Sequence, residues 1–299
     1  MNIPFIKYSK IWLGFSSILV LSSLILLVVF GLKPGIDFTG GSLLELSFDN
    51  RPEVADINNS LSNHNIENPV VQKTGDNGFI IRMKFLSEEE HQALLSGLRD
   101  DFGGEENHVH EESFETIGAS ISSQMRSRST WSAIFVCLAI VLYVAYAFRR
   151  VARPVASWKY GLVAVVALLH DAIIVMGVFA LLGRFAGVEI DIAFVVAILT
   201  IIGYSVNDTI VVFDRIRENL IKRIGNDFTD TVNISINQTL ARSFNTAFTT
   251  LLALLALYFF GGATTHNFVL ALIIGIISGT YSSIFLASPL LVVIERWKK

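Results

Sequence analysis

Charged residues and cysteine are scarce in this 299-residue sequence. Only 16% of the residues are charged, whereas a typical soluble domain carries about 25%. The single cysteine, Cys137, lies in an apolar run, which excludes an internal disulfide and a zinc site built from thiolates. Together with 52% hydrophobic residues, the shortage of charge predicts a membrane protein.

Six long apolar runs reach or approach the roughly 20 residues that cross a bilayer as a helix. They cover residues 11–32, 131–148, 160–183, 192–213, 243–263 and 267–294. The first run is longer than the roughly 7 to 15 apolar residues of a signal peptide, which favours a retained anchor. Four runs contain no charged side chain, while the third contains His170 and Asp171 and the fourth contains Asp208.

The basic residues next to these runs are sorted by side. One set of connectors and ends carries Lys7, Lys10, Arg149, Arg150, Arg153, Lys159, Arg215, Arg217, Lys222, Arg223, Arg296, Lys298 and Lys299. The connectors on the other side carry only Arg184, apart from a long insert at 33–128. The positive-inside rule therefore predicts that both termini are cytoplasmic and that the insert is extracytoplasmic.

The insert at 33–128 has the pattern of a small water-soluble domain. It contains 17 acidic against 8 basic residues, which argues against a nucleic-acid partner. Alternating apolar residues predict strands over 44–48 and 79–85, with shorter strands near 69–74 and 108–115. A helix is predicted over 52–63, and a second begins at Ser87, where Glu90 completes a capping box. This β-α-β-β-α-β order predicts an α+β, ferredoxin-like domain.

The predicted organisation is thus an α-helical polytopic membrane protein in three parts. Residues 1–32 form the N-terminal segment and first span, and residues 33–128 form the extracytoplasmic domain. Residues 129–299 form spans two to six, with a cytoplasmic loop at 214–240 that is predicted to be an amphipathic helix pair. Within it, Glu218 and Lys222 have the i, i+4 spacing of a surface ion pair.

Asp208 is the first candidate functional residue, because a carboxylate inside a span is costly and commonly marks an ion pathway. Helical spacing places Thr200, Tyr204, Asn207 and Asp208 along one stripe. Arg242 opens the fifth span at a similar depth, which makes an Asp208–Arg242 pair plausible. The alternative is that Arg242 extends to the membrane surface and Asp208 makes a static contact between helices.

His170 and Asp171 are the second candidate, because histidine titrates near neutrality and an acid beside it can relay protons. A packing role for His170 is an equal alternative. Adjacent helical residues point about 100° apart, so the two side chains are expected to contact different neighbours. Two residues are too few for a metal site, and no catalytic nucleophile with a base is evident.

Two glycine patterns are interpreted as structural. GIDFTGGS at 35–42 is a turn-rich junction between the first span and the first strand, and no helix follows it as a phosphate site requires. In the sixth span, Ala271, Gly275, Gly279 and Ser283 recur every four residues and predict close helix packing.

Five strings resemble the SecD/SecF family of protein-export membrane proteins, within the RND superfamily of transporters. They are GIDFTGGS at 35–42, HDAII at 170–174, GYSVNDTIVVFDRIREN at 203–219, QTLARSFNT at 238–246 and FFGG at 259–262. The first contains the motif that the resemblance assigns to the span–domain junction, namely Asp37, Phe38, Thr39, Gly40 and Gly41. The likeness extends over the whole chain.

The resemblance implies an auxiliary subunit of the Sec translocase in the bacterial inner membrane, with no enzymatic activity and no cofactor. Its implied partners are SecD, the SecYEG channel, YajC and the translocating polypeptide. The proton or sodium gradient is implied to drive a late step of export, with Asp208 and Arg242 on the ion pathway. The alternatives are a half-size RND-type transporter of small molecules or lipids, an intramembrane hydrolase and a structural scaffold.

Overall fold

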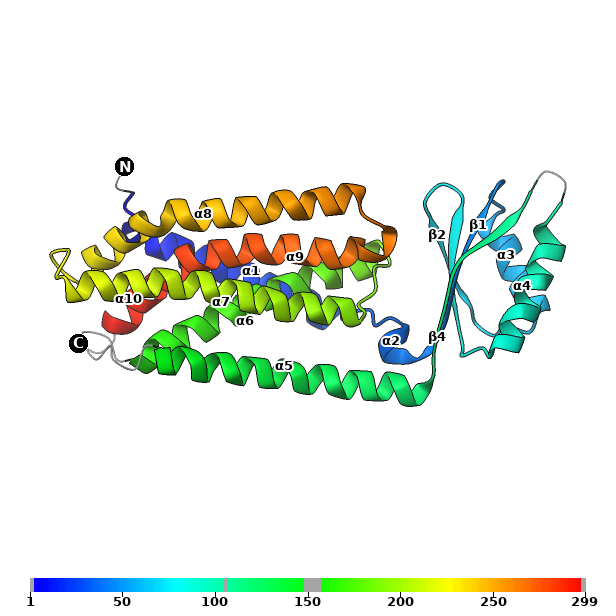
Figure 1. The fold of residues 1–299 in the computed structure, drawn as a ribbon, viewed down its shortest axis with the longest axis horizontal. Coiled ribbons are helices and arrows are strands. Elements are labelled where there is room, and N and C mark those ends of the chain that lie inside the picture. Colours follow the sequence, from blue (N-terminus) through cyan, green and yellow to red (C-terminus); the bar gives the residue numbers. More distant parts are fainter. Residues whose placement is uncertain (1–2, 105–106, 148–156, 297–299) are drawn as a thin grey trace. The chain divides into compact units, whose positions relative to one another are not determined.

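The computed structural model describes residues 3–104, 107–147 and 157–296. The chain divides into two compact units, which Figure 1 shows in ribbon form. One unit comprises Pro34–Ser129, and the other comprises Met1–Lys33 together with Thr130–Lys299. Each unit is described by itself below.

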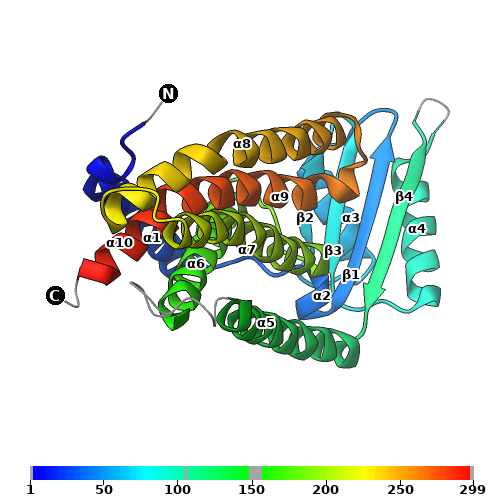
Figure 2. The ribbon, with the colours of Figure 1, turned by 60° about the vertical axis from the view of Figure 1, so that its left-hand side comes forward.

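The smaller unit is built on a four-stranded antiparallel sheet with the strand order β2-β3-β1-β4. Its elements are α2 (Ile36–Thr39), β1 (Gly41–Phe48), α3 (Val54–Asn63), β2 (Val70–Thr74), β3 (Gly78–Met83), α4 (Glu88–Phe102) and β4 (Val109–Ile117). Helices α3 and α4 lie against one face of the sheet (Figure 2). The ferredoxin-like prediction is confirmed, and β4 ends two residues beyond the predicted limit.

The core of this unit lies between the sheet and its two helices. Leu44 and Leu46 of β1 are fully buried there, together with Phe79 of β3, because alternate residues of a strand face the same side. The predicted capping box is present at α4. Glu90 Oε2 accepts from the Ser87 backbone N–H at 2.8 Å, and Ser87 Oγ accepts from the Glu90 N–H at 3.4 Å.

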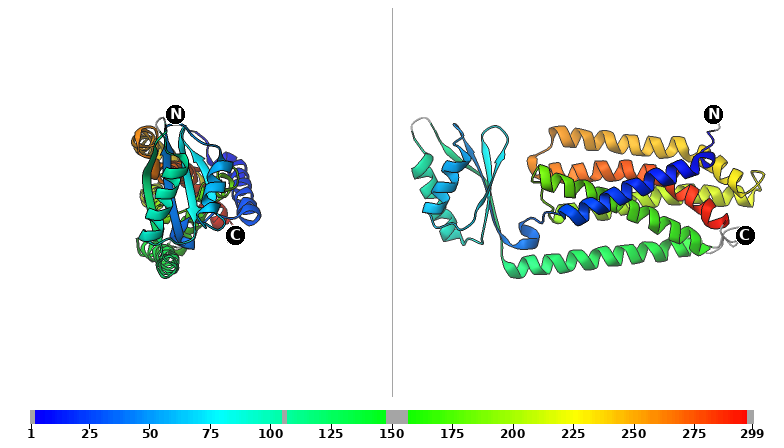
Figure 3. Two further views of the ribbon diagram at one scale, coloured as in Figure 1. Left: turned by 90° about the vertical axis from the view of Figure 1, so that its right-hand side faces the viewer. Right: turned by 180° about the vertical axis from the view of Figure 1, so that it is seen from behind.

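The larger unit is a helical bundle, seen from behind in Figure 3. Its helices are α1 (Ser9–Phe30), α5 (Ala119–Ala147), α6 (Ser157–Phe185), α7 (Ile192–Ile221), α8 (Phe228–Phe260), α9 (Ala263–Ser282) and α10 (Ser288–Arg296). Helix α5 begins within the smaller unit and continues into the bundle. Within the described ranges, six stretches are long and apolar enough to cross a membrane, which confirms the six predicted spans.

The segment at 214–240 differs from its prediction as a separate cytoplasmic helix pair. Helix α7 continues without a break to Ile221, and α8 already begins at Phe228. Polar side chains join the two extensions, since Asn219 Nδ2 donates to Ser235 Oγ at 2.8 Å. The polar sequence therefore lengthens the two spanning helices, and the predicted Glu218–Lys222 ion pair is present at 2.6 Å.

The sixth apolar run is not one continuous α-helix. A π-helical segment, η2 (Ser283–Ala287), separates α9 from α10. Wider helical turns of this kind are rare and frequently occur at functional sites.

Both described ends of the chain lie beside the start of α8. The backbone N–H of Ile3 donates to Asn237 Oδ1 at 2.8 Å, and Arg296 Nη2 donates to Thr229 Oγ1 at 3.2 Å. Five of the basic residues used to predict the orientation lie outside the described residues, namely Arg149, Arg150, Arg153, Lys298 and Lys299. The cytoplasmic placement of the termini stays a prediction.

Candidate functional site

Asp171 lies fully buried at the centre of the bundle, on α6. Three serine hydroxyls from two other helices donate to its carboxylate: Ser205 of α7 at 2.5 Å, and Ser278 and Ser282 of α9 at 2.8 and 2.7 Å. Among the described residues, no lysine or arginine pairs with it. The donors that reach this carboxylate from α7 and α9 are thus neutral hydroxyls.

Close packing of α9 on α7 brings these serines within reach. At Gly279, an added Cβ would lie 3.0 Å from the Cβ of Ser205, and at Gly275 it would lie 2.3 Å from Ile201 Cδ1. Only glycine allows the two backbones to approach this closely. The small-residue stripe predicted for close packing is therefore confirmed at these two positions.

His170 makes a direct contact with its sequence neighbour. Its Nδ1 lies 2.9 Å from Asp171 Oδ1, and its ring stacks on Tyr281 with centroids 6.1 Å apart. The two side chains have different neighbours as expected, since Asp171 bonds the serines and His170 stacks on Tyr281, but they also contact each other. The pair sits in the bundle interior, where His170 is 3% exposed.

Asp208 is half-buried on α7, one helical turn after Ser205. Ser243 of α8 donates to Asp208 Oδ1 at 2.6 Å, and Ser283 of η2 donates to Oδ2. The carboxylate therefore joins three elements of the bundle. As with Asp171, no lysine or arginine pairs with it in the described part of the chain.

Two consecutive serines connect the two carboxylates. Ser282, the last residue of α9, bonds Asp171, while Ser283, the first residue of η2, bonds Asp208. The hydroxyl of Ser288 donates to the backbone oxygen of Ser283, five residues back, at 3.2 Å. A change in the pitch of this helix therefore acts on both carboxylates at once.

Of the two alternatives for Arg242, the pair with Asp208 is not formed among the described residues. Its side chain is exposed, and no ion pair joins it to Asp208 within the described ranges. The neighbouring Ser243 occupies the inward position of α8 and donates to Asp208 in its place. Because adjacent helical positions point about 100° apart, only one of these two residues can face the carboxylate at a time.

The remaining stripe residues of α7 lie on a face that this chain leaves partly uncovered. Thr200 and Asn207 are exposed, and Tyr204 is half-buried beside Thr250 of α8. The Thr200 hydroxyl donates to the Val196 backbone oxygen at 2.8 Å. The structure thus brings Asp208 into the bundle and leaves most of its predicted stripe outside.

Sequence reasoning missed the serines that bond the carboxylates. Ser278 and Ser282 are spaced i, i+4 in an apolar span, and this spacing was the available signal for a polar face. No sequence signal identifies which acid each serine would contact.

The glycine pair of the junction motif is required by backbone geometry. Gly40 and Gly41 have φ angles of +73° and +123°, and a Cβ at Gly41 would lie 2.6 Å from the Met83 carbonyl oxygen. Arg126 of α5 donates to the Phe38 carbonyl oxygen at 2.6 Å, which ties the motif to the start of that helix.

The other motif residues fit the same structural role. Asp37 and Thr39 lie in the four-residue helix α2, and the Thr39 hydroxyl donates to the Gly35 carbonyl oxygen at 3.0 Å. The motif thus joins strand β1 to helix α5 within the smaller unit.

The chemistry open to the bundle site is the binding of a proton. Carboxylates inside spans commonly mark ion pathways, and a carboxylate can bind and release a proton without any other cofactor. No group of three or more histidine, cysteine or acidic side chains with a metal-binding arrangement occurs among the residues that the structure describes.

Two family models match the chain. The model described as protein export membrane protein SecD/SecF, C-terminal, matches residues 100–297, and the SecD/SecF GG motif model matches residues 25–50. The first matched range includes Asp171 and Asp208, and the second includes the Gly40–Gly41 pair.

Curated proteins and solved structures agree with these matches. The chain is 44% identical to the protein translocase subunit SecF of Thermobaculum terrenum, covering 93% of this chain and 89% of that protein. It is 39% identical to the subunit of the same name from Desulfurispirillum indicum, covering 97% and 91%. The crystal structure of SecDF from Thermus, described as a translocon-associated membrane protein, superposes with a TM-score of 0.85 at 33% identity. That match covers 100% of this chain but 39% of the SecDF chain.

Proposed function

Since the chain belongs to the SecD/SecF family of protein-export membrane proteins, we propose that it acts as a SecF-type auxiliary subunit of the Sec protein translocase. The carboxylates of Asp171 and Asp208, held by serine hydroxyls and without a lysine or arginine partner among the described residues, carry the proposal that this subunit is driven by an ion gradient. The role is a non-enzymatic one, in which gradient energy moves the bundle during a late step of export.

Comparison with SecDF supports SecD as the partner. This chain accounts for 39% of the SecDF chain, so the remaining part corresponds to a second component. The exposed polar residues Thr200, Asn207 and Arg242 are costly against lipid and suit a protein neighbour. SecYEG, YajC and the translocating polypeptide complete the proposed assembly in the bacterial inner membrane.

The proposed mechanism begins with protonation of Asp208. The neutral acid binds the Ser243 and Ser283 hydroxyls less strongly than the carboxylate, because hydrogen bonds to an ionised acceptor are roughly twice as strong. Helix α8 and segment η2 are then free to shift against α7, and a rotation of α8 brings Arg242 toward Asp208 in place of Ser243. The bundle alternates between two packings whose balance depends on protonation.

Asp208→Asn tests the coupling role, because asparagine keeps the side-chain shape but cannot exchange a proton. The matched control is Asp214→Asn on the same helix, where the carboxylate is 61% exposed and pairs with Arg217. Each variant is reconstituted with SecD, SecYEG and SecA, the ATPase that the family resemblance implies for this translocase, and export is measured with the gradient intact and collapsed.

We expect Asp208→Asn to assemble normally, to keep ATP-driven export and to lose gradient stimulation, while Asp214→Asn keeps both. Arg242→Lys, which keeps the charge but loses the planar guanidinium, should reduce stimulation as well. Equal gradient stimulation in Asp208→Asn and the parent would remove Asp208 from the ion pathway.

Reporter fusions test the proposed orientation. Fusions at Asp76 should report the extracytoplasmic side, and fusions at Lys222 the cytoplasmic side. The reverse pattern would overturn the placement of both termini in the cytoplasm.

A further inference from the structure

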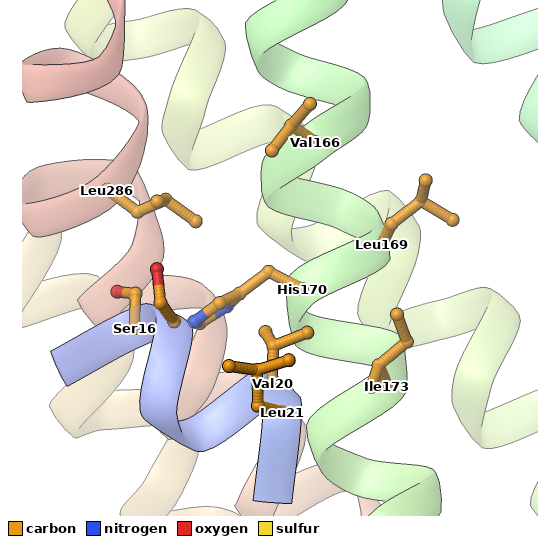
Figure 4. Close-up of a pocket in the computed structure, with 9 residues that line it drawn as sticks. Ser16, Val20, Leu21, Val166, Leu169, His170, Ile173 and Leu286 are labelled. Atoms are coloured by element: carbon orange, nitrogen blue, oxygen red, sulfur yellow. The ribbon is translucent and has the colours of Figure 1, made fainter. Parts of the chain in front are cut away.

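A cavity of about 430 Å³ opens between α1 and α6, and Asp208 is not among the residues that line it. Ser16, Ser17 and Val20 of α1 line it, together with His170 and Ile173 of α6 and Leu286 of η2 (Figure 4). Asp208, by contrast, contacts α8 and η2 through Ser243 and Ser283. The walls of the cavity are mostly apolar, with the imidazole and two hydroxyls as its polar groups.

His170 contributes a buried nitrogen that lacks a partner. Its Nδ1 is taken by Asp171, while Nε2 has no hydrogen-bond partner among the described residues. The side chain is 3% exposed and points from α6 toward α1 in Figure 4. Leaving such a nitrogen unpaired is costly, so a polar molecule at this position is favoured.

The groups around His170 allow a water molecule to bind there. Ser16 Oγ lies 3.1 Å from the Tyr281 hydroxyl, and Ser17 Oγ donates to the Leu13 carbonyl oxygen, so both retain acceptor capacity. A buried water typically makes about three hydrogen bonds, and a water here can donate one to Nε2 and one to a serine hydroxyl. The titratable groups facing His170 are Asp171 on its own helix and Tyr281 on α9. Helices α1 and η2 present no charged side chain to the cavity.

We propose that water in this cavity binds His170 Nε2 and exchanges protons with Asp171 through the imidazole. Asp171 then has an access route of its own, separate from Asp208. The proposal rests on the proposed gradient-coupled function and adds a second proton-binding carboxylate to it.

The proton balance of the relay is simple. A hydronium ion in the cavity gives its proton to Nε2 and becomes water, and the proton on Nδ1 passes to Asp171 Oδ1. The products are a neutral Asp171 acid and a neutral imidazole protonated at Nε2. The return transfer follows the same atoms in reverse.

The path also connects with Asp208, because two consecutive serines at the junction of α9 and η2 bond the two carboxylates. Protonation of Asp171 weakens its bond from Ser282, and the next residue, Ser283, bonds Asp208. Protonation of Asp171 from the cavity therefore shifts η2, and this shift alters the hydrogen bond that Ser283 makes to Asp208. His170 acts here as a proton-transfer residue, and Ser282 and Ser283 act as positioning residues.

Thiol labelling tests the hydration of the cavity. The single native cysteine is removed by Cys137→Ser, and cysteine is then introduced by Val20→Cys in the cavity wall or by Ile18→Cys on the same helix. Ile18 is 66% exposed and is not among the residues that line the cavity, so it serves as the lipid-facing control. The probe is a charged methanethiosulfonate reagent added to membranes that contain the intact complex, with total thiol counted after denaturation.

We expect Val20→Cys to react about tenfold faster than Ile18→Cys or more, because only the hydrated thiol ionises readily to the reactive thiolate. Equal slow labelling of the two variants would show that lipid chains fill the cavity, and the proposal would fail. This measurement does not depend on transport, so its outcome is independent of the proposed function.

His170→Asn tests the relay itself. Asparagine can still hydrogen-bond Asp171 but has no second ring nitrogen to meet the cavity water. We expect it to assemble with SecD and to reduce gradient-stimulated export about tenfold, with a changed pH profile. Suppose that Asp208→Asn abolishes gradient stimulation of export, while His170→Asn changes neither the magnitude nor the pH profile of that stimulation. The relay then fails and the proposed function stands. If neither variant affects stimulation, the proposed function fails as well.

Discussion

The two units of this chain place apolar and acidic side chains in opposite ways. In the smaller unit, Leu44 and Leu46 fill the interior and carboxylates such as Glu90 remain in water. In the bundle, large apolar side chains such as Val28 and Phe260 are 86% and 90% exposed, while Asp171 is fully buried. Water favours the first arrangement and hydrocarbon favours the second, so the same residue types have opposite roles in one chain.

Of the changes that test this contrast, a carboxylate placed in the core of the smaller unit should have the largest effect on stability. Leu46→Asp puts an unpaired charge where no serine hydroxyls surround it, and we expect a loss of about 4 kcal/mol or more in the stability of this unit. Hydrogen exchange of β1 and β3 in the full chain measures the effect. The control is Val70→Asp on the edge strand β2, where the side chain is 47% exposed. Equal protection in both variants would contradict the comparison.

Removing the carboxylate from the bundle is the reciprocal change. Asp171→Leu leaves three serine hydroxyls and His170 Nδ1 without their acceptor, and we expect a loss of about 3 kcal/mol in bundle stability. Asp171→Asn keeps an acceptor oxygen and should cost less, about 1 kcal/mol. Thermal unfolding in detergent measures both variants. A leucine variant as stable as the parent would mean that the buried acid contributes nothing to folding.

The packing of α9 on α7 offers a smaller test within the bundle. Gly279→Leu forces a side chain against Ser205, and we expect it to cost about 2 kcal/mol and to displace Ser278 and Ser282 from Asp171. Leu270→Ala, at a half-buried position of the same helix, should be milder. Yield of the assembled complex with SecD is the measurement. Equal yields would show that close approach at Gly279 is unnecessary.

The smallest effect is expected at the surface of the smaller unit. Ser87→Ala removes the cap of α4 at a cost of about 1 kcal/mol, measured by amide exchange in the first helical turn. The Ser87 backbone N–H also lowers the pKa of Glu90 below its usual value. The stabilisation from this carboxylate is therefore present at neutral pH and is lost as the pH falls below about 4. Glu90→Gln should abolish that acid dependence, and an unchanged dependence would assign it to other carboxyls.

Much of the fold was predictable because it depends on local patterns. The alternation around Leu44 and Leu46 identified β1, and the Ser87–Glu90 spacing identified the start of α4. The limits of helices were harder to predict where polar sequence continues a spanning helix. Asn219 and Ser235 are polar residues that bond each other across α7 and α8, so polarity there signals a helix pairing and not a loop.

The candidate site was predictable in its acids but not in their partners. Asp171 and Asp208 stand out because charges are rare in apolar runs. A pair of Arg242 with Asp208 was one of two alternatives that the sequence left open, and the rotation of α8 places Ser243 there. Nothing local in the sequence sets that rotation.

By itself, the sequence determined the six spans, the ferredoxin-like domain and the two acids that hydrocarbon makes costly, because these follow from hydropathy and local spacing. Only the tertiary structure decided that Ser282 and Ser283 divide between Asp171 and Asp208, and that His170 faces a cavity on α1. Those contacts depend on how far each helix is rotated and how closely its glycines let it approach a neighbour. Rotation and approach are properties of packed pairs of helices, and no single segment encodes them.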